Sequence, residues 1–210
     1  MDSEKETRLP QTDFWAKILS TVFHPVFSPT LCLAIILSST GFSLFQISTT
    51  QKILLISLIF LNTAILPALF SFLLVKFGFI SSLQMQASRE RFWPYFITTA
   101  FYLFTYLLLQ DANLPQIIYN LQLGGITAIL ITALINIKWK ISAHMTGMGG
   151  LSAMCLNSTI SHGQGGVLIG VFVLLLSGLI GTCRVQLKAH SFSQIIAGWI
   201  NGFCSLTLFI

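Results

Sequence analysis

Three stretches of this chain carry arginine, lysine and histidine side chains at spacings that suit the binding of an anion. In the second stretch, residues 138–150, Lys140 and His144 are four residues apart, which places them on one face of the helix expected to begin in this stretch. In the third stretch, five residues separate Arg184 from His190. The three stretches are SRERFWPYF at 88–96, KWKISAHMTGMGG at 138–150 and GTCRVQLKAHSFSQ at 181–194.

If these groups meet in the folded chain, they supply what the transfer of a phosphoryl group needs. Arginine side chains stabilise the charge that collects on the equatorial oxygens of phosphorus. One histidine can attack phosphorus, and the other can protonate the leaving alcohol, because an imidazole changes its charge near neutral pH. This chemistry requires no metal, and the only acidic side chain near the three stretches is Glu90. We therefore expect neither a metal nor another cofactor.

The composition indicates that these stretches belong to a membrane protein. Of the 210 residues, 54% are hydrophobic and only 8% are charged, whereas about 25% are charged in an ordinary soluble domain. A membrane-spanning helix needs about 20 apolar residues. The sequence therefore predicts an all-α fold, a polytopic transmembrane helical bundle of about seven spans. We expect these spans near residues 26–47, 53–75, 92–109, 117–137, 142–160, 165–183 and 192–210.

The fifth expected span is unusually rich in small residues, with the sequence GMGGLSAMCLNST at its centre. Small residues usually lie where two helices approach closely. We therefore predict that this span is buried among its neighbours and does not face lipid.

The chain is expected to form one domain after a short N-terminal segment. Residues 1–25 mix acidic and basic side chains, which does not resemble a signal peptide, and are predicted to form a tail and an interfacial segment. Residues 26–210 are predicted to form a single transmembrane helical domain. His24 lies in HPVFSP, where the prolines suit a helix start. We interpret it as a structural residue of that turn.

Seven crossings would place ten of the eleven basic residues on one face of the membrane, leaving only Lys52 on the other. The positive-inside rule produces this asymmetry without any chemistry. Convergent cations that bind an anion would also produce it. The first explanation suffices for Lys5, Arg8, Lys17 and Lys76. The second is favoured for the remaining loops, because these also contain the histidines.

The third stretch resembles a motif of the type-2 phosphatidic acid phosphatase superfamily, which comprises membrane-embedded lipid phosphatases and their relatives. That motif is S-R-x5-H-x3-D, and it commonly continues into an apolar helix with Ala-Gly. Arg184 and His190 match its spacing, and HSFSQIIAGWING is similar to its continuation.

The other two motifs of the superfamily are matched more loosely. P-S-G-H is represented by ISAH, residues 141–144, which keeps Ser142 and His144. K-x6-R-P is represented by Arg89 and Arg91 ahead of Pro94, without a lysine at the expected spacing.

The resemblance implies a six-helix phosphatase-like core, with its motifs within residues 88–202, and a role for each matched residue. His190 would be the nucleophile that becomes phosphohistidine, and His144 would be the general acid for the leaving group. Lys140 is a candidate for the missing lysine, because it lies on the His144 face. The implied ligands of the substrate phosphate are Arg184, Arg91, Arg89 and Ser142.

The sequence departs from the superfamily at two positions of the third motif. Gln194 replaces an aspartate that would orient the nucleophilic histidine and stabilise its charged form. A glutamine can hold the ring, but it cannot offset a positive charge. Cys183 replaces the serine before Arg184.

Two functions therefore stay open. The first is an integral-membrane phosphatase that removes phosphate from a lipid phosphate or lipid diphosphate, so the expected partners are this substrate and membrane lipids. The second is an inactive relative that acts as a lipid-binding or structural membrane protein. Nothing supports a transporter or a partner nucleic acid, and the sequence does not indicate an oligomeric state.

The expected location is a bacterial inner membrane, in a multi-pass topology. When the candidate site residues Arg89, Arg91, Lys140 and Arg184 are discounted, six basic residues on one face still oppose one on the other. This charge balance favours a cytoplasmic site. Many bacterial members of the superfamily that the chain resembles act from the outer face of the membrane, so the face to which the site opens stays undecided.

Overall fold

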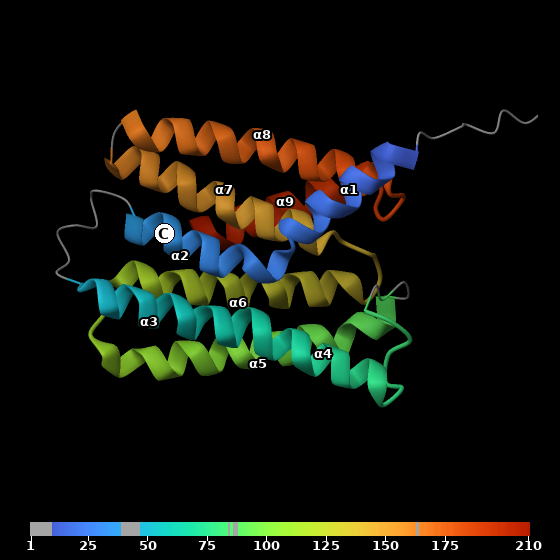
Figure 1. The fold of residues 1–210 in the computed structure, drawn as a ribbon, viewed down its shortest axis with the longest axis horizontal. Coiled ribbons are helices and arrows are strands. Elements are labelled where there is room, and N and C mark those ends of the chain that lie inside the picture. The colour runs from blue at the N-terminus through green and yellow to red at the C-terminus, as the bar shows by residue number, and fades with distance from the viewer. Residues whose placement is uncertain (1–9, 39–46, 84, 86–87, 163) are drawn as a thin grey trace, which may run out of the picture.

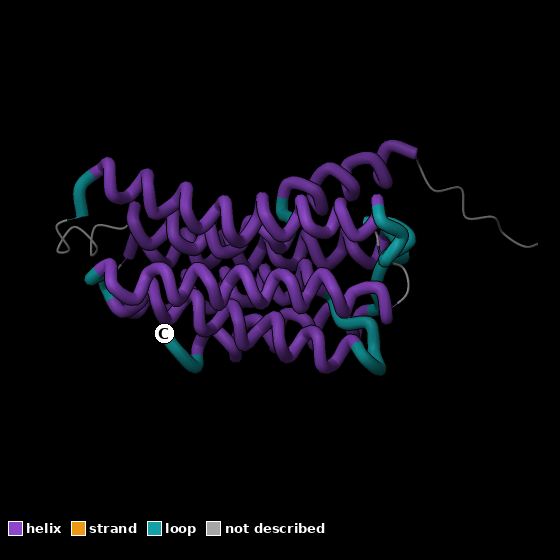
Figure 2. Tube along the Cα trace, turned by 90° about the horizontal axis from the view of Figure 1, so that it is seen from below, coloured by secondary structure: helices purple, strands orange, loops and turns teal. Residues whose placement is uncertain are grey.

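The chain runs back and forth along one axis as a bundle of helices (Figure 1). The structure is a computed structural model that describes residues 10–38, 47–83, 85, 88–162 and 164–210. Those residues form helices and turns, with no strand among them, and a second view shows the helices side by side along the same axis (Figure 2). The α-helices are α1 Pro10–Val22, α2 Ser28–Ser38, α3 Thr49–Phe60, α4 Leu66–Lys76, α5 Phe92–Leu109, α6 Gln116–Asn136, α7 Ala143–His162, α8 Gln164–Gln186 and α9 Phe192–Thr207.

The all-helical prediction is confirmed, and the described residues include five helical stretches that are long and apolar enough to cross a membrane. They are Asp13–Ser38, Thr49–Lys76, Arg89–Ala112, Gln116–Asn136 and Val167–Gln186. Their outer faces carry exposed leucine and phenylalanine side chains, such as Phe172 and Leu175 on α8. These features are compatible with a multi-pass membrane protein. α7 is rich in small and polar residues and α9 has only 16 residues, so neither belongs to the five.

Within residues 1–25, which were predicted to form a tail and an interfacial segment, the structure describes the helix α1. α1 and α2 are joined by a short turn, Pro25–Phe27, whose backbone N–H at Val26 donates to Nδ1 of His24 at 3.5 Å. Pro25 begins this turn and Pro29 lies in the first turn of α2, so both prolines are at helix starts as expected, within the longer helical stretch Asp13–Ser38. Residues 39–46 of that expected span lie outside the described residues.

α7 is the central helix of the bundle, and it contacts α9 through glycine. A Cβ atom added at Gly202 of α9 would collide with the backbone oxygen of Thr146, and one added at Gly149 of α7 would collide with that of Trp199. Only glycine allows the two backbones to lie this close. The prediction that this small-residue segment is buried is therefore confirmed.

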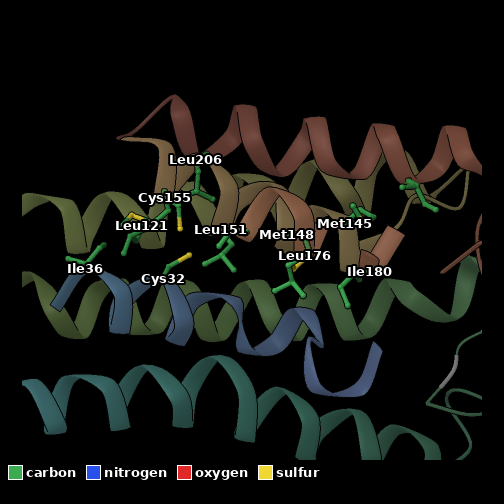
Figure 3. Close-up of a cluster of buried hydrophobic side chains, with 14 residues drawn as sticks. Cys32, Ile36, Leu121, Met145, Met148, Leu151, Cys155, Leu176, Ile180 and Leu206 are labelled. Carbon is green, nitrogen blue, oxygen red and sulfur yellow. The ribbon is translucent and has the colours of Figure 1, made fainter. Parts of the chain in front are cut away.

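The main hydrophobic core forms around the same helix (Figure 3). Met145, Met148 and Leu151 of α7 are each less than 5% exposed. They pack with Cys32 and Ile36 of α2 and with apolar side chains from α6, α8 and α9. This packing fixes the start of α7, and with it His144, relative to the other helices.

Candidate active site

The basic loops gather at one end of the bundle, the end at which α4, α6 and α8 finish and α5, α7 and α9 begin (Figure 1). Lys52 lies in the first turn of α3, at the opposite end of the bundle. Lys5 and Arg8 lie outside the described residues. The basic residues described at the first end are Lys17, Lys76, Arg89, Arg91, Lys138, Lys140, Arg184 and Lys188.

A cavity of about 790 Å³ extends from this end into the bundle. It continues past Cys32, Tyr102, Leu121 and Leu206, which give it an apolar wall between α2, α5, α6 and α9. One cavity therefore joins a cationic end to an apolar interior. Its cationic and imidazole lining consists of Lys17, His24, Arg91, His144, Arg184 and His190.

His190 lies in the loop between α8 and α9, and hydrogen bonds to the last turn of α8 hold the backbone of this loop. The backbone N–H groups of Ala189 and His190 donate to the carbonyl oxygen of Arg184 at 3.1 and 3.4 Å. Lys188 has a positive φ of 52°, which turns the chain back after α8. The five residues between Arg184 and His190 thus form one tight turn, which fixes the imidazole relative to Arg184. The spacing of R-x5-H has a local structural basis in this turn.

One ring nitrogen of His190, Nδ1, is engaged in hydrogen bonds. Its Nδ1 lies 3.2 Å from Oε1 of Gln194 and 3.3 Å from the carbonyl oxygen of Lys140. The carbonyl oxygen can only accept, and the glutamine oxygen already accepts the backbone N–H of Ser191 at 3.1 Å. Nδ1 must therefore carry the proton, and the lone pair of the neutral ring is on Nε2.

The surroundings of His190 favour its neutral form. The side chain is buried, and the positive charges of Arg91, Arg184 and Lys140 lie close to it. Burial and then these charges lower the pKa of His190 to about 4, although the hydrogen bond that Nδ1 donates to Gln194 acts in the opposite direction. At neutral pH the ring is therefore uncharged, with a lone pair on Nε2, which is the form that can attack an electrophile.

Gln194 has a local role as well as its contact with His190. Ser191 and Gln194 form a capping box at the start of α9, in which each side chain binds the backbone of the other. The pattern S-x-x-Q is recognisable in the sequence, and it accounts for glutamine at this position without reference to catalysis.

His144 lies in the first turn of α7 and is held by the N-terminal segment. Its Nε2 lies 2.9 Å from the carbonyl oxygen of Ser20. Since a carbonyl can only accept, Nε2 carries a proton, and Nδ1 is the nitrogen that can gain or lose one. The ring of His24 meets that of His144 edge to face, with 5.1 Å between the ring centroids.

The two arginines on the cavity differ in what binds them. Arg91 donates from Nε to the carbonyl oxygen of Met85 at 3.1 Å. The Nε atom of Arg184 is buried and has no hydrogen-bond partner among the described residues. Arg184 therefore has an unused donor at Nε, which suits an anionic ligand. Arg89 is exposed and does not line the cavity.

Besides Arg89, two further side chains that were expected to bind phosphate do not line the cavity. Ser142 is completely buried, and its hydroxyl accepts the backbone N–H of Met145 at 3.4 Å. Lys140 presents its carbonyl oxygen to His190, and burial together with the charges of Arg91 and Arg184 lowers the pKa of its ammonium group. Lys140 thus lies near the cationic group without lining the cavity, whereas Ser142 supports the start of α7.

Two of the cationic and imidazole side chains that line the cavity were not predicted as site residues. His24 was interpreted as structural, and it does accept a hydrogen bond in its turn, but it also contacts His144. Lys17 was assigned to the positive-inside pattern and lines the same cavity. Both come from a segment more than 100 residues before His144, so no spacing in the sequence indicated the contact.

In the described part of the chain, no group of three or more His, Cys, Asp or Glu side chains is arranged to hold a metal ion. Comparisons with family models, curated proteins and solved structures found no match for this chain. Its function must therefore be inferred from the site, where neutral His190 has a free Nε2, His144 can exchange a proton at Nδ1, and two guanidinium groups lie beside them.

Proposed function

We propose that this protein is an integral-membrane phosphatase that removes phosphate from a lipid phosphate or lipid diphosphate. The observation that carries the proposal is the single cavity that joins Arg91, Arg184, His144 and His190 to an apolar interior. A phosphate group suits the cationic end, and an acyl or prenyl chain suits the apolar wall. The resemblance to type-2 phosphatidic acid phosphatases supports the same function.

In the proposed reaction, Nε2 of His190 attacks phosphorus while the bond from phosphorus to the leaving oxygen breaks. The negative charge of the bound phosphate favours the imidazolium form of His144. This imidazolium gives its Nδ1 proton to that oxygen and becomes neutral, so the lipid leaves as an alcohol or a monophosphate. Water then attacks the phosphohistidine, His144 takes a proton from the water, and inorganic phosphate leaves. Arg184 and Arg91 stabilise the charge on the equatorial oxygens in both steps.

The test is release of inorganic phosphate by the purified protein from a panel of lipid phosphates and diphosphates. We expect release by the parent and a loss of about 10³-fold or more in His190→Ala. A ³²P-labelled substrate should leave an acid-labile label on the parent and none on His190→Ala. An active His190→Ala variant would exclude the phosphohistidine mechanism.

The second candidate is an inactive relative that binds anionic lipid. Gln194 favours it, because glutamine provides no charge to stabilise a protonated histidine, and its capping of α9 is a sufficient structural reason for its presence. This candidate predicts that the parent binds lipid phosphate, that this binding depends on Arg184, and that no phosphate is released.

We also propose that the chain crosses a membrane seven times, with α7 and α9 as spans within the bundle, and that this membrane is a bacterial inner membrane. Lys188, in the loop before α9, and Asn113, in the loop before α6, would then lie on opposite sides. Single cysteines at these two positions, in a variant without the native cysteines, should react with a membrane-impermeant maleimide from opposite sides. Reaction of both from one side would contradict seven crossings.

A further inference from the structure

The N-terminal segment, which lies outside the stretch that resembles lipid phosphatases, reaches the cavity beside His144. Lys17, Ser20 and His24 all line that cavity. The His144 side chain contacts the Ser20 carbonyl oxygen, 2.9 Å from its Nε2, and the ring of His24, with 5.1 Å between the ring centroids. The orientation of His144 therefore depends on a segment distant in the sequence.

The turn that carries His24 is seated closely on α7. A Cβ atom at Gly147, three residues after His144, would lie 2.5 Å from the hydroxyl oxygen of Ser28 and 3.3 Å from Cα of Pro25. Glycine at this position lets the turn approach the helix. His24 is fixed within the turn by the bond from the Val26 N–H to its Nδ1. The turn, the ring of His24 and the ring of His144 thus form one packed unit.

Holding an imidazole from two sides limits its rotation. The Ser20 carbonyl fixes which nitrogen of His144 carries the permanent proton, and the edge-to-face contact with His24 restricts the plane of the ring. A general acid works only when its proton lies on the line to the leaving oxygen, and misplacement by about 1 Å can reduce a rate by about 10²-fold.

We propose that His24 is a positioning residue for His144, and that the N-terminal segment 17–28 is therefore part of the active site. The proposal rests on the proposed function, in which His144 protonates the leaving group. His24 acts through its ring and not through proton transfer, because no hydrogen bond joins the two imidazoles among the contacts of these residues.

The kinetic test compares two substrates that differ in their need for a general acid. An alkyl phosphate must leave as an alcohol and needs the proton, whereas a nitrophenyl phosphate leaves as a stable phenolate and needs it little. We expect His24→Ala to lose about 10- to 100-fold in kcat on the alkyl phosphate and little on the nitrophenyl phosphate. His144→Ala should show the same selectivity, and His190→Ala should lose both reactions. Equal losses of His24→Ala on both substrates, or no loss on either, would overturn the proposal.

Two conservative variants separate the ring contact from the capping of the turn. His24→Phe keeps a flat ring against His144 but loses the acceptor for Val26, whereas His24→Asn keeps a side-chain acceptor and loses the ring. We expect the phenylalanine variant to retain most of the alkyl phosphate activity and the asparagine variant to resemble His24→Ala. The opposite order would show that His24 only caps its turn. His162→Ala, at the far end of α7, is the matched histidine control.

A measurement without substrate distinguishes a failure of this proposal from a failure of the proposed function. The full chain has four histidines, so ¹⁵N-labelled imidazole signals can be assigned from single variants. We expect His144 in the parent as the Nε2–H tautomer, and in His24→Ala as a mixture of tautomers or a broadened signal. An unchanged His144 signal would overturn the positioning role even if the enzyme is active. If the His144 signal changes in His24→Ala as expected but the parent releases no phosphate, only the proposed function is overturned.

Discussion

The Nδ1 atom of His190 lies 3.2 Å from Oε1 of Gln194, and this oxygen also accepts the backbone N–H of Ser191. One neutral side chain thus begins α9 and fixes the tautomer of the candidate nucleophile. Because glutamine has no charge, nothing in this contact offsets the positive groups around His190. The low pKa of His190, about 4, follows from its burial and from Arg91 and Arg184.

Gln194→Asp is expected to move the acid limb of the pH–rate profile to higher pH. A histidine attacks only when neutral, so activity in the parent should fall as the pH drops through the His190 pKa, near pH about 4. A carboxylate at 194 stabilises the protonated ring and raises this pKa. The loss should then occur at a higher pH in the variant. The profile of kcat/KM measures this pKa in the free enzyme.

The control for this variant is Ser193→Asp, which adds the same charge one residue earlier at an exposed position. Solvent screening there should leave the profile nearly unchanged. Gln194→Ala should lower the rate near neutral pH by freeing the ring of His190. An active parent with the same profile in both Gln194 variants would mean that Gln194 does not act on His190.

Arg184→Lys is expected to reduce kcat/KM for a lipid phosphate by about 10- to 100-fold, roughly the contribution of one hydrogen bond to a charged group. The Arg184 Nε has no partner among the described residues, and a lysine keeps the charge but loses the planar pair of donors. Arg91→Lys should lose less, because the Nε of Arg91 is already bound to Met85. Steady-state kinetics of both variants provide the test. A larger loss in Arg91→Lys would reverse the order of the two ligands.

The all-helical fold and the bounds of helices such as α5 were predicted from the sequence because they are encoded locally. The span expected at 92–109 has the same bounds as α5, and the small residues of α7 indicated its burial before Gly149 and Gly202 were seen to bring two backbones together. Apolar length and residue size act within a single segment, so they can be read without knowledge of the fold.

The contact of His144 with Ser20 and His24 could not be predicted in the same way. These residues are more than 100 positions apart, and HPVFSP alone indicates only a turn. Ser142 and Arg89 were expected to bind phosphate because they match positions of the superfamily motifs. A motif does not give the geometry that decides whether a side chain reaches the cavity. Gln194 is an intermediate case, because its capping box is a local pattern and its contact with His190 is not.

Gly202→Ala is expected to destabilise the protein by about 1–3 kcal/mol, because the added methyl group would collide with the backbone oxygen of Thr146 in α7. Gly178→Ala in α8 is the matched control, since nothing lies within 4 Å of its added Cβ atom. The control should be neutral or slightly stabilising, because alanine favours helix. Thermal unfolding of the two variants in one detergent measures the difference. Equal stability would show that α7 and α9 are not in direct backbone contact.

Gly147→Ala tests whether the N-terminal turn must stay seated on α7 for His144 to work. The added Cβ atom would lie 2.5 Å from the Ser28 hydroxyl oxygen, which can rotate away, and 3.3 Å from Cα of Pro25, which cannot. The turn should therefore shift and carry His24 away from His144. We expect a loss on an alkyl phosphate with little loss on a nitrophenyl phosphate, the same selectivity as in His24→Ala.

The double variant decides whether the two changes act through one contact. If Gly147→Ala works by displacing His24, then adding it to His24→Ala should cost little further activity, because the contact is already lost. Independent effects would instead multiply in the rates, that is, add in free energy. The measurement is kcat on the alkyl phosphate for both single variants and the double variant, with Gly178→Ala as the glycine control. A double variant as slow as the product of the two single effects would mean that Gly147 supports the site by a route that does not involve His24.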